Sequence, residues 1–149
     1  MTVYFYSPRE IPHGCFSNFS PHGFKLDGDW WRTSEHYFQA QKFVNTDLDW
    51  AQKIQTVKAP KEAARMGRNR QHPLRTDWEE IKDEIMYQAV LCKFQNHQDI
   101  QQILLETKEA PIVENSPIDY YWGCGKDGTG KNKLGEILMQ VRSIIRHSI

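Results

Sequence analysis

Several features that would assign this chain to a familiar class are missing from its 149 residues. Lys and Arg together number 19 and so do Asp and Glu, so no net charge favours general binding to duplex nucleic acid. No run of about 18 apolar residues occurs, so we expect no transmembrane helix. The first ten residues lack a basic start followed by an apolar stretch, so we expect no secretory signal either.

Cysteine is scarce, and its spacing excludes a disulfide framework. Cys15, Cys92 and Cys124 are odd in number and far apart, which favours a reducing environment and a cytoplasmic location. No Cys-x-x-Cys pair and no His-Glu-x-x-His helix is present, and the neighbours His13 and Cys15 are a weak zinc signal. We therefore predict that the protein needs neither a metal ion nor an organic cofactor.

What the chain does contain is a series of helix signals with few strands. Thr33 or Ser34 is a helix cap, and residues 76–79 have the pattern of a capping box. Asp27-Gly28 is a turn signal that predicts a hairpin. We expect helices at about 34–44, 48–56 and 60–67, from the capping box at 76–79 to about 96, near 103–105 and at 132–146. We expect strands at 3–6, at 24–26 followed by 30–31, and at 112–113.

This order of elements indicates the fold class. Helices outnumber strands, and strands and helices do not alternate regularly, so we predict an α+β fold that is mainly helical, with a small sheet. A chain of 149 residues has the usual size of one domain and buries roughly two thirds of the surface exposed when unfolded. We therefore predict a single compact domain over residues 1–149.

The helix expected from Ser34 to Phe43 has a narrow polar stripe. Glu35, Gln39 and Lys42 stand at i, i+4 and i+7, so they share one face, while aromatic residues fill much of the rest. A stripe bounded by rings is suited to line a cavity, and Glu35 is then a candidate catalytic carboxylate. The alternative is an exposed glutamate on an ordinary surface helix, since solvated charges are the default.

Aromatic and small polar residues alternate in the segment before this helix. Phe16 and Trp31 offer flat faces on which a base or a similar ring could stack, and the amide of Asn18 could read the edge of such a ring. The alternative is a set of core residues beneath a loop.

A glycine-rich stretch precedes the last expected helix. Such a loop can present backbone N–H groups to a phosphate, which makes Gly123, Gly125 and Asn132 candidate binding residues. The run GKDGTGKN is close to a Walker A motif, but Asn132 replaces the hydroxyl residue that holds magnesium, so we exclude a nucleoside triphosphatase. Asp119 and Trp122 at the loop's start place a carboxylate beside rings, so Asp119 is a candidate acid or base. An ordinary helix entry and an Asp turn are the alternatives.

One basic residue between these two segments is a candidate phosphate ligand. Arg68 follows a glycine at the expected end of a helix, and its guanidinium can hold a phosphate through two parallel hydrogen bonds. The alternative is a solvated basic residue that the helix dipole favours.

Taken in order, these segments resemble the YbiA-like, or NADAR, family from about Tyr4 to Arg142. Two blocks are specific: SEHYFQAQKF, which ends at Phe43, and WGCGKDGTGKN, which begins at Trp122. Further matching pieces are GCFSNFS at 14–20, LDG with Trp31, MGR at 66–68, Trp78 with Met86, Lys93-Phe94, Val113-Glu114, Asp119, and LGEILM with Arg142.

The resemblance implies a mainly helical α+β fold and N-glycosidase activity. Similar members hydrolyse the ribosyl–nitrogen bond of phosphoribosylamino-pyrimidines, early intermediates of riboflavin biosynthesis, and release ribose 5-phosphate. It implies that Glu35 is the catalytic carboxylate and Asp119 the second acid. The rings of Phe16, Trp31 and Trp122 would form the base pocket, while Lys42, Arg68, Asn132 and the glycine loop would hold ribose phosphate, with Gln39 and Asn18 among the binding residues.

Two alternatives remain open at this point. The first is an ADP-ribosyl hydrolase that removes ADP-ribose from modified nucleobases, as other branches of the family do, and only this alternative involves modified nucleic acid. The second is a non-catalytic module that binds a nucleotide or ADP-ribose. In the favoured interpretation the partner is a small phosphoribosyl-pyrimidine, no membrane is involved, and the oligomeric state stays open.

Overall fold

Helices make up most of the secondary structure, as the sequence predicts. The computed structural model describes residues 1–149, and none of its helices has both the length and the apolar character that a membrane span requires. In chain order the elements are β1 (Val3–Phe5), the 3-10 helix η1 (His13–Phe16), β2 (Phe24–Leu26), β3 (Asp29–Trp31), α1 (Ser34–Gln41), α2 (Leu48–Thr56), α3 (Pro60–Gly67), α4 (Trp78–Asn96), α5 (Gln98–Glu106), β4 (Ile112–Glu114) and α6 (Lys133–His147).

These elements fall into two compact units. The first consists of Met1–Ser20 with Phe94–Ile149, and the second of Pro21–Lys93. Each unit holds a two-stranded sheet: β1 pairs with β4 in parallel, and β2 pairs with β3 as the predicted antiparallel hairpin. The α+β, mainly helical class is confirmed, but there are two small sheets where the sequence predicted one. The reason is that β1 pairs with a strand more than 100 residues away rather than with the hairpin.

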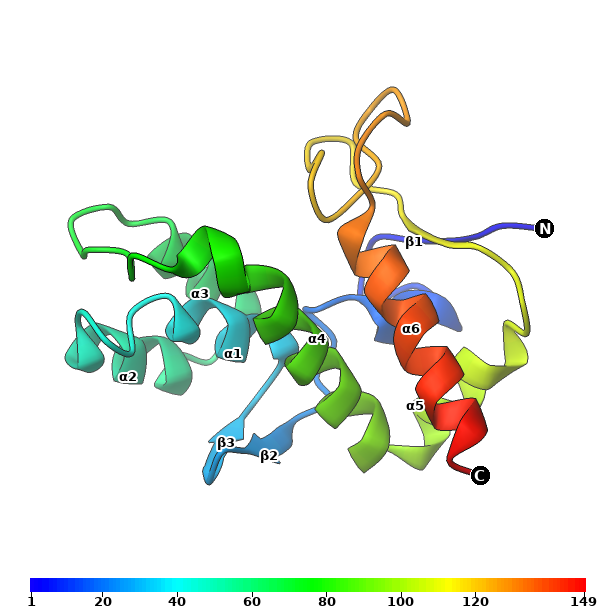
Figure 1. Cartoon of the computed structure of the whole chain (residues 1–149), viewed down its shortest axis with the longest axis horizontal. Helices are drawn as coiled ribbons and strands as arrows, with labels where there is room; N and C mark the ends of the chain where they lie inside the picture. The colour runs from blue at the N-terminus through cyan, green and yellow to red at the C-terminus, as the bar shows by residue number, and fades with distance from the viewer. The chain divides into compact units, whose positions relative to one another are not determined.

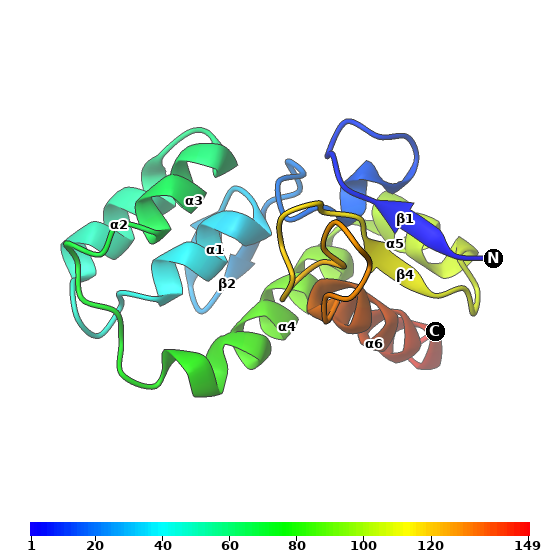
Figure 2. The same ribbon diagram turned by 90° about the horizontal axis from the view of Figure 1, so that it is seen from above.

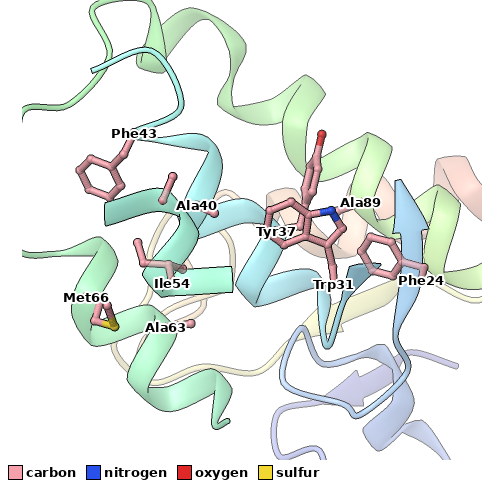
Figure 3. Packing of buried hydrophobic residues seen from close by; sticks show 10 residues of the cluster. Phe24, Trp31, Tyr37, Ala40, Phe43, Ile54, Ala63, Met66 and Ala89 are labelled. Atoms are coloured by element: carbon pink, nitrogen blue, oxygen red, sulfur yellow. The ribbon is translucent and has the colours of Figure 1, made fainter. Parts of the chain in front are cut away.

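In the second unit, α1, α2 and α3 lie side by side (Figure 1). Figure 3 shows Phe43, Ile54 and Met66 meeting between them, and Ala40 and Ala63 fill the space where a larger side chain would push the helices apart. Because α1 is covered by its neighbours, every residue from Ser34 to Gln39 is buried, and its polar side chains lie inside the protein.

In the first unit, α6 packs on β4, and the loop that precedes α6 crosses above the helix start (Figure 2). Gly135 permits this approach, because a Cβ there would lie only 2.1 Å from the carbonyl oxygen of Ile112. The apolar face predicted for this helix is buried, including Leu134, Leu138 and Val141. The glycine loop is therefore fixed at both ends, by β4 and by α6.

His36 secures the start of α1. The Thr33 hydroxyl oxygen accepts from the backbone N–H of His36 as the helix cap, and it lies 2.8 Å from Nδ1 of the same residue. The other ring nitrogen, Nε2, donates to the carbonyl oxygen of Val57 at 2.8 Å. Both nitrogens are used by the neutral ring, and burial, followed by the nearby charge of Arg32, lowers the pKa of His36 despite the bond to Val57.

We expect the free energy of unfolding to fall as the pH drops below about 6.5. A base with a lowered pKa takes up its proton more readily in the unfolded chain, so the stability that its neutral form provides is complete above the unfolded pKa and is lost on acidification. Urea midpoints at pH 7.5, 6.5 and 5.5 measure this, with the exposed His147→Gln as a control. An equally steep decline in His36→Gln would contradict the assignment to His36.

Candidate functional site

The polar stripe of α1 is buried, and its members contact one another. Glu35, Gln39 and Lys42 are 8%, 6% and 7% exposed, which excludes the alternative of an exposed surface glutamate. Nε2 of Gln39 donates to Oε2 of Glu35 at 2.7 Å, as the i, i+4 spacing predicts. The helix ends at Gln41, two residues before the expected end, but Lys42 keeps helical dihedral angles as the C-cap and stays on the same face.

The last residue of α3 faces this stripe and connects it to the following segment. The carbonyl oxygen of Gly67 accepts from Nζ of Lys42 at 3.4 Å and from a guanidinium nitrogen of Arg70 at 3.0 Å. A Cβ at Gly67 would lie 1.8 Å from Oε1 of Gln39, so only glycine leaves room for the amide. Gly67 thus contacts two side chains of the stripe: its carbonyl oxygen accepts from Lys42, and its missing Cβ leaves room for the amide of Gln39.

Gln39 is held in an orientation that serves Glu35. Its Oε1 is buried and has no hydrogen-bond partner, while its Nε2 donates to the carboxylate. An unpaired buried acceptor costs about 1–3 kcal/mol. The amide keeps this orientation because turning it over would place two oxygens against each other. Glu35 therefore receives a hydrogen bond from a donor of fixed orientation.

Three positively charged residues, Lys42, Arg68 and Arg70, gather at the end of the stripe. Burial, followed by the charges of Arg70, Arg68 and Lys82, lowers the pKa of Lys42 to about 8 against the opposing effect of Glu35. Lys82 pairs with Glu79. No carboxylate lies within 4.0 Å of the charged nitrogens of Lys42, Arg68 or Arg70; the ion pairs of the protein are elsewhere. Such a cluster is suited to an anion such as a phosphate.

Two neighbouring rings lie beside the ammonium group of Lys42. Nζ of Lys42 lies 5.6 Å from the ring centre of Phe38 and 5.8 Å from that of Trp78. The two rings are themselves 5.0 Å apart. Cation–π attraction of this kind is worth about 0.5–2 kcal/mol, so the rings offset part of the cost of burying a charge that has no acidic partner.

In the first unit, the side chain of Asp119 stabilises a turn of the backbone. Its Oδ1 accepts from the backbone N–H groups of Tyr121 and Trp122 at 2.9 and 2.8 Å, which is the turn that the sequence left as an alternative. Its own N–H donates to the hydroxyl of Ser116. Oδ2 takes part in neither bond, so one oxygen of the carboxylate stays available for a ligand.

The glycine-rich loop uses most of its N–H groups itself, which favours the alternative of an ordinary helix entry. The first two amides of α6, those of Lys133 and Leu134, donate to the carbonyl oxygens of Tyr121 and Trp122 at 3.0 Å. Within the loop, five more amides donate to backbone carbonyl oxygens at 2.7–3.3 Å: those of Cys124, Gly128, Gly130, Lys131 and Asn132. The helix start therefore lacks the row of free donors that a phosphate cradle needs.

Asn132 is also tied to the protein rather than directed to solvent. It adopts a left-handed backbone conformation with φ 53°. Its Nδ2 donates to the carbonyl oxygen of Ile112, and its Oδ1 accepts from the N–H of Glu114, both at 2.9 Å. The amide joins the loop to β4, and its predicted role in binding ribose phosphate stays a prediction.

The residues predicted to form the base pocket differ in burial and lie in both units. Phe16, 1% exposed, packs edge-on against Phe5 in the core of the first unit. Trp31, 4% exposed, packs edge-on against Tyr37 in the second. Both positions favour the alternative of a core residue. Of the other two residues predicted to contact the base, Asn18 is buried and has polar or ring contacts, and Trp122 is half-buried.

A hollow of about 370 Å³ lies over β1, β4 and the glycine loop. Gly125 and Asn132 from the predicted set line it, together with Tyr4, Val113, Asn115, Cys124, Lys126, Gly128 and Gly130. Gly123 lies nearby, held against Glu114, where a Cβ would stand 2.8 Å from a carboxylate oxygen. No group of three or more His, Cys, Asp and Glu side chains lies together in a way that could hold a metal ion.

Three residues that the sequence analysis did not select belong to the site of α1. Gly67 and Arg70 contact Lys42 or its bonding partner, and Trp78 faces the ammonium group. The sequence offered one signal, the row of arginines around Gly67, but the choice among them needed the tertiary structure. The charge of Arg70 lowers the pKa of Lys42 more than that of Arg68 does.

Comparison with known proteins gives a consistent result. The model of the NADAR domain matches residues 4–146 and so spans both units. An N-glycosidase of Nostoc punctiforme is 49% identical over 148 residues, which cover 99% of this chain and 94% of that protein. The N-glycosidase YbiA of Escherichia coli is 46% identical over 94% of this chain and 86% of its own.

The solution structure of E. coli YbiA resembles this fold with a TM-score of 0.90 at 44% sequence identity, covering 99% of this chain and 88% of YbiA. The chloroplastic riboflavin biosynthesis protein PYRR of maize is 46% identical over 96% of this chain, which corresponds to 25% of the maize protein.

Proposed function

This chain belongs to the NADAR domain family, and on that premise we propose that it is an N-glycosidase of riboflavin-pathway intermediates. The bond it hydrolyses joins the ribose to the amino nitrogen of a phosphoribosylamino-pyrimidine, and the product is ribose 5-phosphate. The observation that carries the proposal is a buried carboxylate, Glu35, on the same helix face as the buried cation Lys42. The names of the bacterial relatives and of the maize protein support the activity and the pathway.

Glu35 would act on the ribose carbon that loses its nitrogen substituent. Cleavage of a ribosyl–nitrogen bond passes through an oxocarbenium-like state, in which positive charge builds on the ribose while the departing nitrogen keeps the bonding electrons. A fixed carboxylate stabilises that charge and takes a proton from the attacking water, whose oxygen forms the new bond to carbon. The leaving nitrogen regains a proton, so the sum is hydrolysis.

The cluster of Lys42, Arg68 and Arg70 would hold the phosphate of the same substrate. None of its three side chains forms an ion pair with a carboxylate within 4.0 Å. A phosphate dianion would offset their positive charge and accept hydrogen bonds from their N–H groups. A group fixed at the phosphate positions the ribose, which contributes to the rate through orientation. Of the predicted phosphate contacts this proposal keeps Lys42 and Arg68, and it adds Arg70.

Asp119 is proposed as the second acid, through its Oδ2. Asp119→Asn keeps an oxygen in the position of Oδ1, so both turn bonds persist, and we expect the free energy of unfolding to stay within about 0.5 kcal/mol of wild type. We expect kcat to fall nonetheless, because the charge is lost. Asp119→Ala, which also removes the turn acceptor, should lower stability by about 1–2 kcal/mol. Wild-type kcat in folded Asp119→Asn would limit Asp119 to the turn.

The remaining assignments follow from the same premise. The family match over residues 4–146 supports one domain for the whole chain, and the three free thiols support a reducing, cytoplasmic location. The partner is then a small metabolite.

The decisive experiment offers the purified protein two substrates separately. One is the phosphoribosylaminopyrimidine intermediate, and the other is an ADP-ribosylated nucleobase, with products followed by mass spectrometry. Release of ribose 5-phosphate from the first supports the proposal. Release of ADP-ribose alone would move the protein to the other branch of the family, and release from neither would leave a binding module.

A further inference from the structure

The segment that carries Arg68 and Arg70 has no regular secondary structure between α3 and α4, yet it is held firmly at one point. The imidazole of His72 lies face to face on the indole of Trp50, with ring centres 3.8 Å apart and planes only 4° apart. Nδ1 of His72 donates to Oδ2 of Asp47 at 2.7 Å. A stack and a hydrogen bond together fix the ring in both position and rotation.

The surface on which His72 rests is itself fixed. Trp50 donates from Nε1 to the carbonyl oxygen of Met66 at 3.2 Å, and its backbone N–H donates to Oδ1 of Asp47 at 3.1 Å. Both carboxylate oxygens of Asp47 are thus used, one as the cap of α2 and one for His72. The bond from His72, and next that from Trp50, lower the pKa of Asp47, so it stays ionised at neutral pH.

These contacts flank the carbonyl group of Gly67, which accepts hydrogen bonds from two residues of the cation cluster. Trp50 is bonded to Met66, the residue before Gly67, and His72 stands two residues after Arg70. Between them, the oxygen of Gly67 accepts from both Lys42 and Arg70. The backbone on either side of the cluster is therefore tied to the first turn of α2.

We propose that Asp47, Trp50 and His72 form a clamp that positions Arg70 for the phosphate of the substrate. The three are positioning residues: they act through the placement of Arg70 beside Lys42 and touch no reacting atom. This inference rests on the proposed function, since it assumes that the cation cluster takes the phosphate. It assigns an effect on substrate affinity to residues at the start of α2 and after α3 that lie outside the cation cluster.

The test measures binding of ribose 5-phosphate and of ribose by calorimetry, and kcat and KM with the phosphoribosyl substrate. In His72→Ala we expect the Kd for ribose 5-phosphate and the KM to rise about tenfold, which is the loss of one charged hydrogen bond. Binding of ribose and kcat should change less than twofold. In an Arg70→Ala background, His72→Ala should have no further effect, since the clamp then has nothing to position.

A second variant protects the test against loss of folding. Asp47→Ser keeps an oxygen that caps α2 but removes the partner of His72, and we expect the same selective rise in Kd. The exposed Glu109→Ser, which removes an ion pair in the other unit, is its control and should leave both ligands unaffected.

The outcomes separate the clamp from the proposed function. Unchanged binding of ribose 5-phosphate in His72→Ala or Asp47→Ser, or equal losses for ribose and its phosphate, would overturn the clamp even if the enzyme turns over its substrate. Selective weakening in a protein that hydrolyses neither substrate would support the clamp and refute the activity. A wild-type protein that binds ribose 5-phosphate no better than ribose would overturn the clamp and the phosphate role of the cation cluster, while the activity is decided by release of ribose 5-phosphate.

Discussion

Replacement of Glu35 by Gln is expected to lower kcat by about 10²–10⁴-fold, the usual contribution of one positioned acid or base. The substitution changes little besides charge, because the new side chain keeps an oxygen that can accept from Nε2 of Gln39, as Oε2 does at 2.7 Å in wild type. The oxocarbenium-like state loses its counter-charge, and the attacking water loses its proton acceptor. Single-turnover release of ribose 5-phosphate, followed by mass spectrometry, isolates this step.

A matched control exists on α4. Gln88 donates to Glu84 at 2.8 Å with the same i, i+4 spacing, but this pair is exposed to solvent. Glu84→Gln should therefore retain full activity and stability. If Glu35→Gln is folded and also retains near wild-type turnover, Glu35 is not the catalytic carboxylate and the mechanism is wrong.

Replacement of Lys42 by Met is expected to make the protein more stable and to weaken its hold on substrate. Because burial lowers the pKa of Lys42 from 10.5 to about 8, the folded state at pH 7 carries a charge that the unfolded chain accommodates more easily. At ~1.4 kcal/mol per pKa unit, the buried charge destabilises the folded state by on the order of 3 kcal/mol. Methionine has no charge to bury, so the variant should avoid this cost. KM should rise about 10–100-fold through loss of a charged hydrogen bond to the phosphate.

The pH dependence gives an independent measurement. Lys42 is cationic below its pKa, so kcat/KM should be highest below about pH 8 and should decline as the pH rises through that value. Lys42→Arg, which stays charged, should remove the decline, and the exposed Lys58→Met should keep it. Lower stability in Lys42→Met together with an unchanged KM would contradict the assignment of a binding role.

The sequence predicted the site of α1 better than that of the glycine loop, for a physical reason. In a helix the spacing fixes which residues share a face, so the i, i+4 spacing alone was enough to predict that Glu35 and Gln39 meet. In a loop no such period exists, and whether an N–H group is free depends on its partners. Most amides of the loop before α6 donate to carbonyl oxygens of the loop or of β4, and the sequence pattern does not predict these partners.

The sequence pattern also did not predict which aromatic residues are buried in the core. Phe16 and Trp31 looked suited to stack on a base, because rings beside polar residues occur in binding sites as well as in cores. The packing of Trp31 on Tyr37, and of Phe16 on Phe5, favours a core position for both rings. The choice between Arg68 and Arg70 likewise depended on which side chain reaches the carbonyl oxygen of Gly67.

The sequence by itself determined the helices, their order, the polar stripe of α1 and the family. Caps, turns and 3.6-residue periodicity are local, and local rules can be read along one chain. Only the tertiary structure decided that Glu35 and Lys42 are buried, that Gly67 connects them to Arg70, and that β1 pairs with β4. Burial and partner choice are settled by packing between residues far apart in the chain, where contacts, rather than spacing, set the free energy of each group.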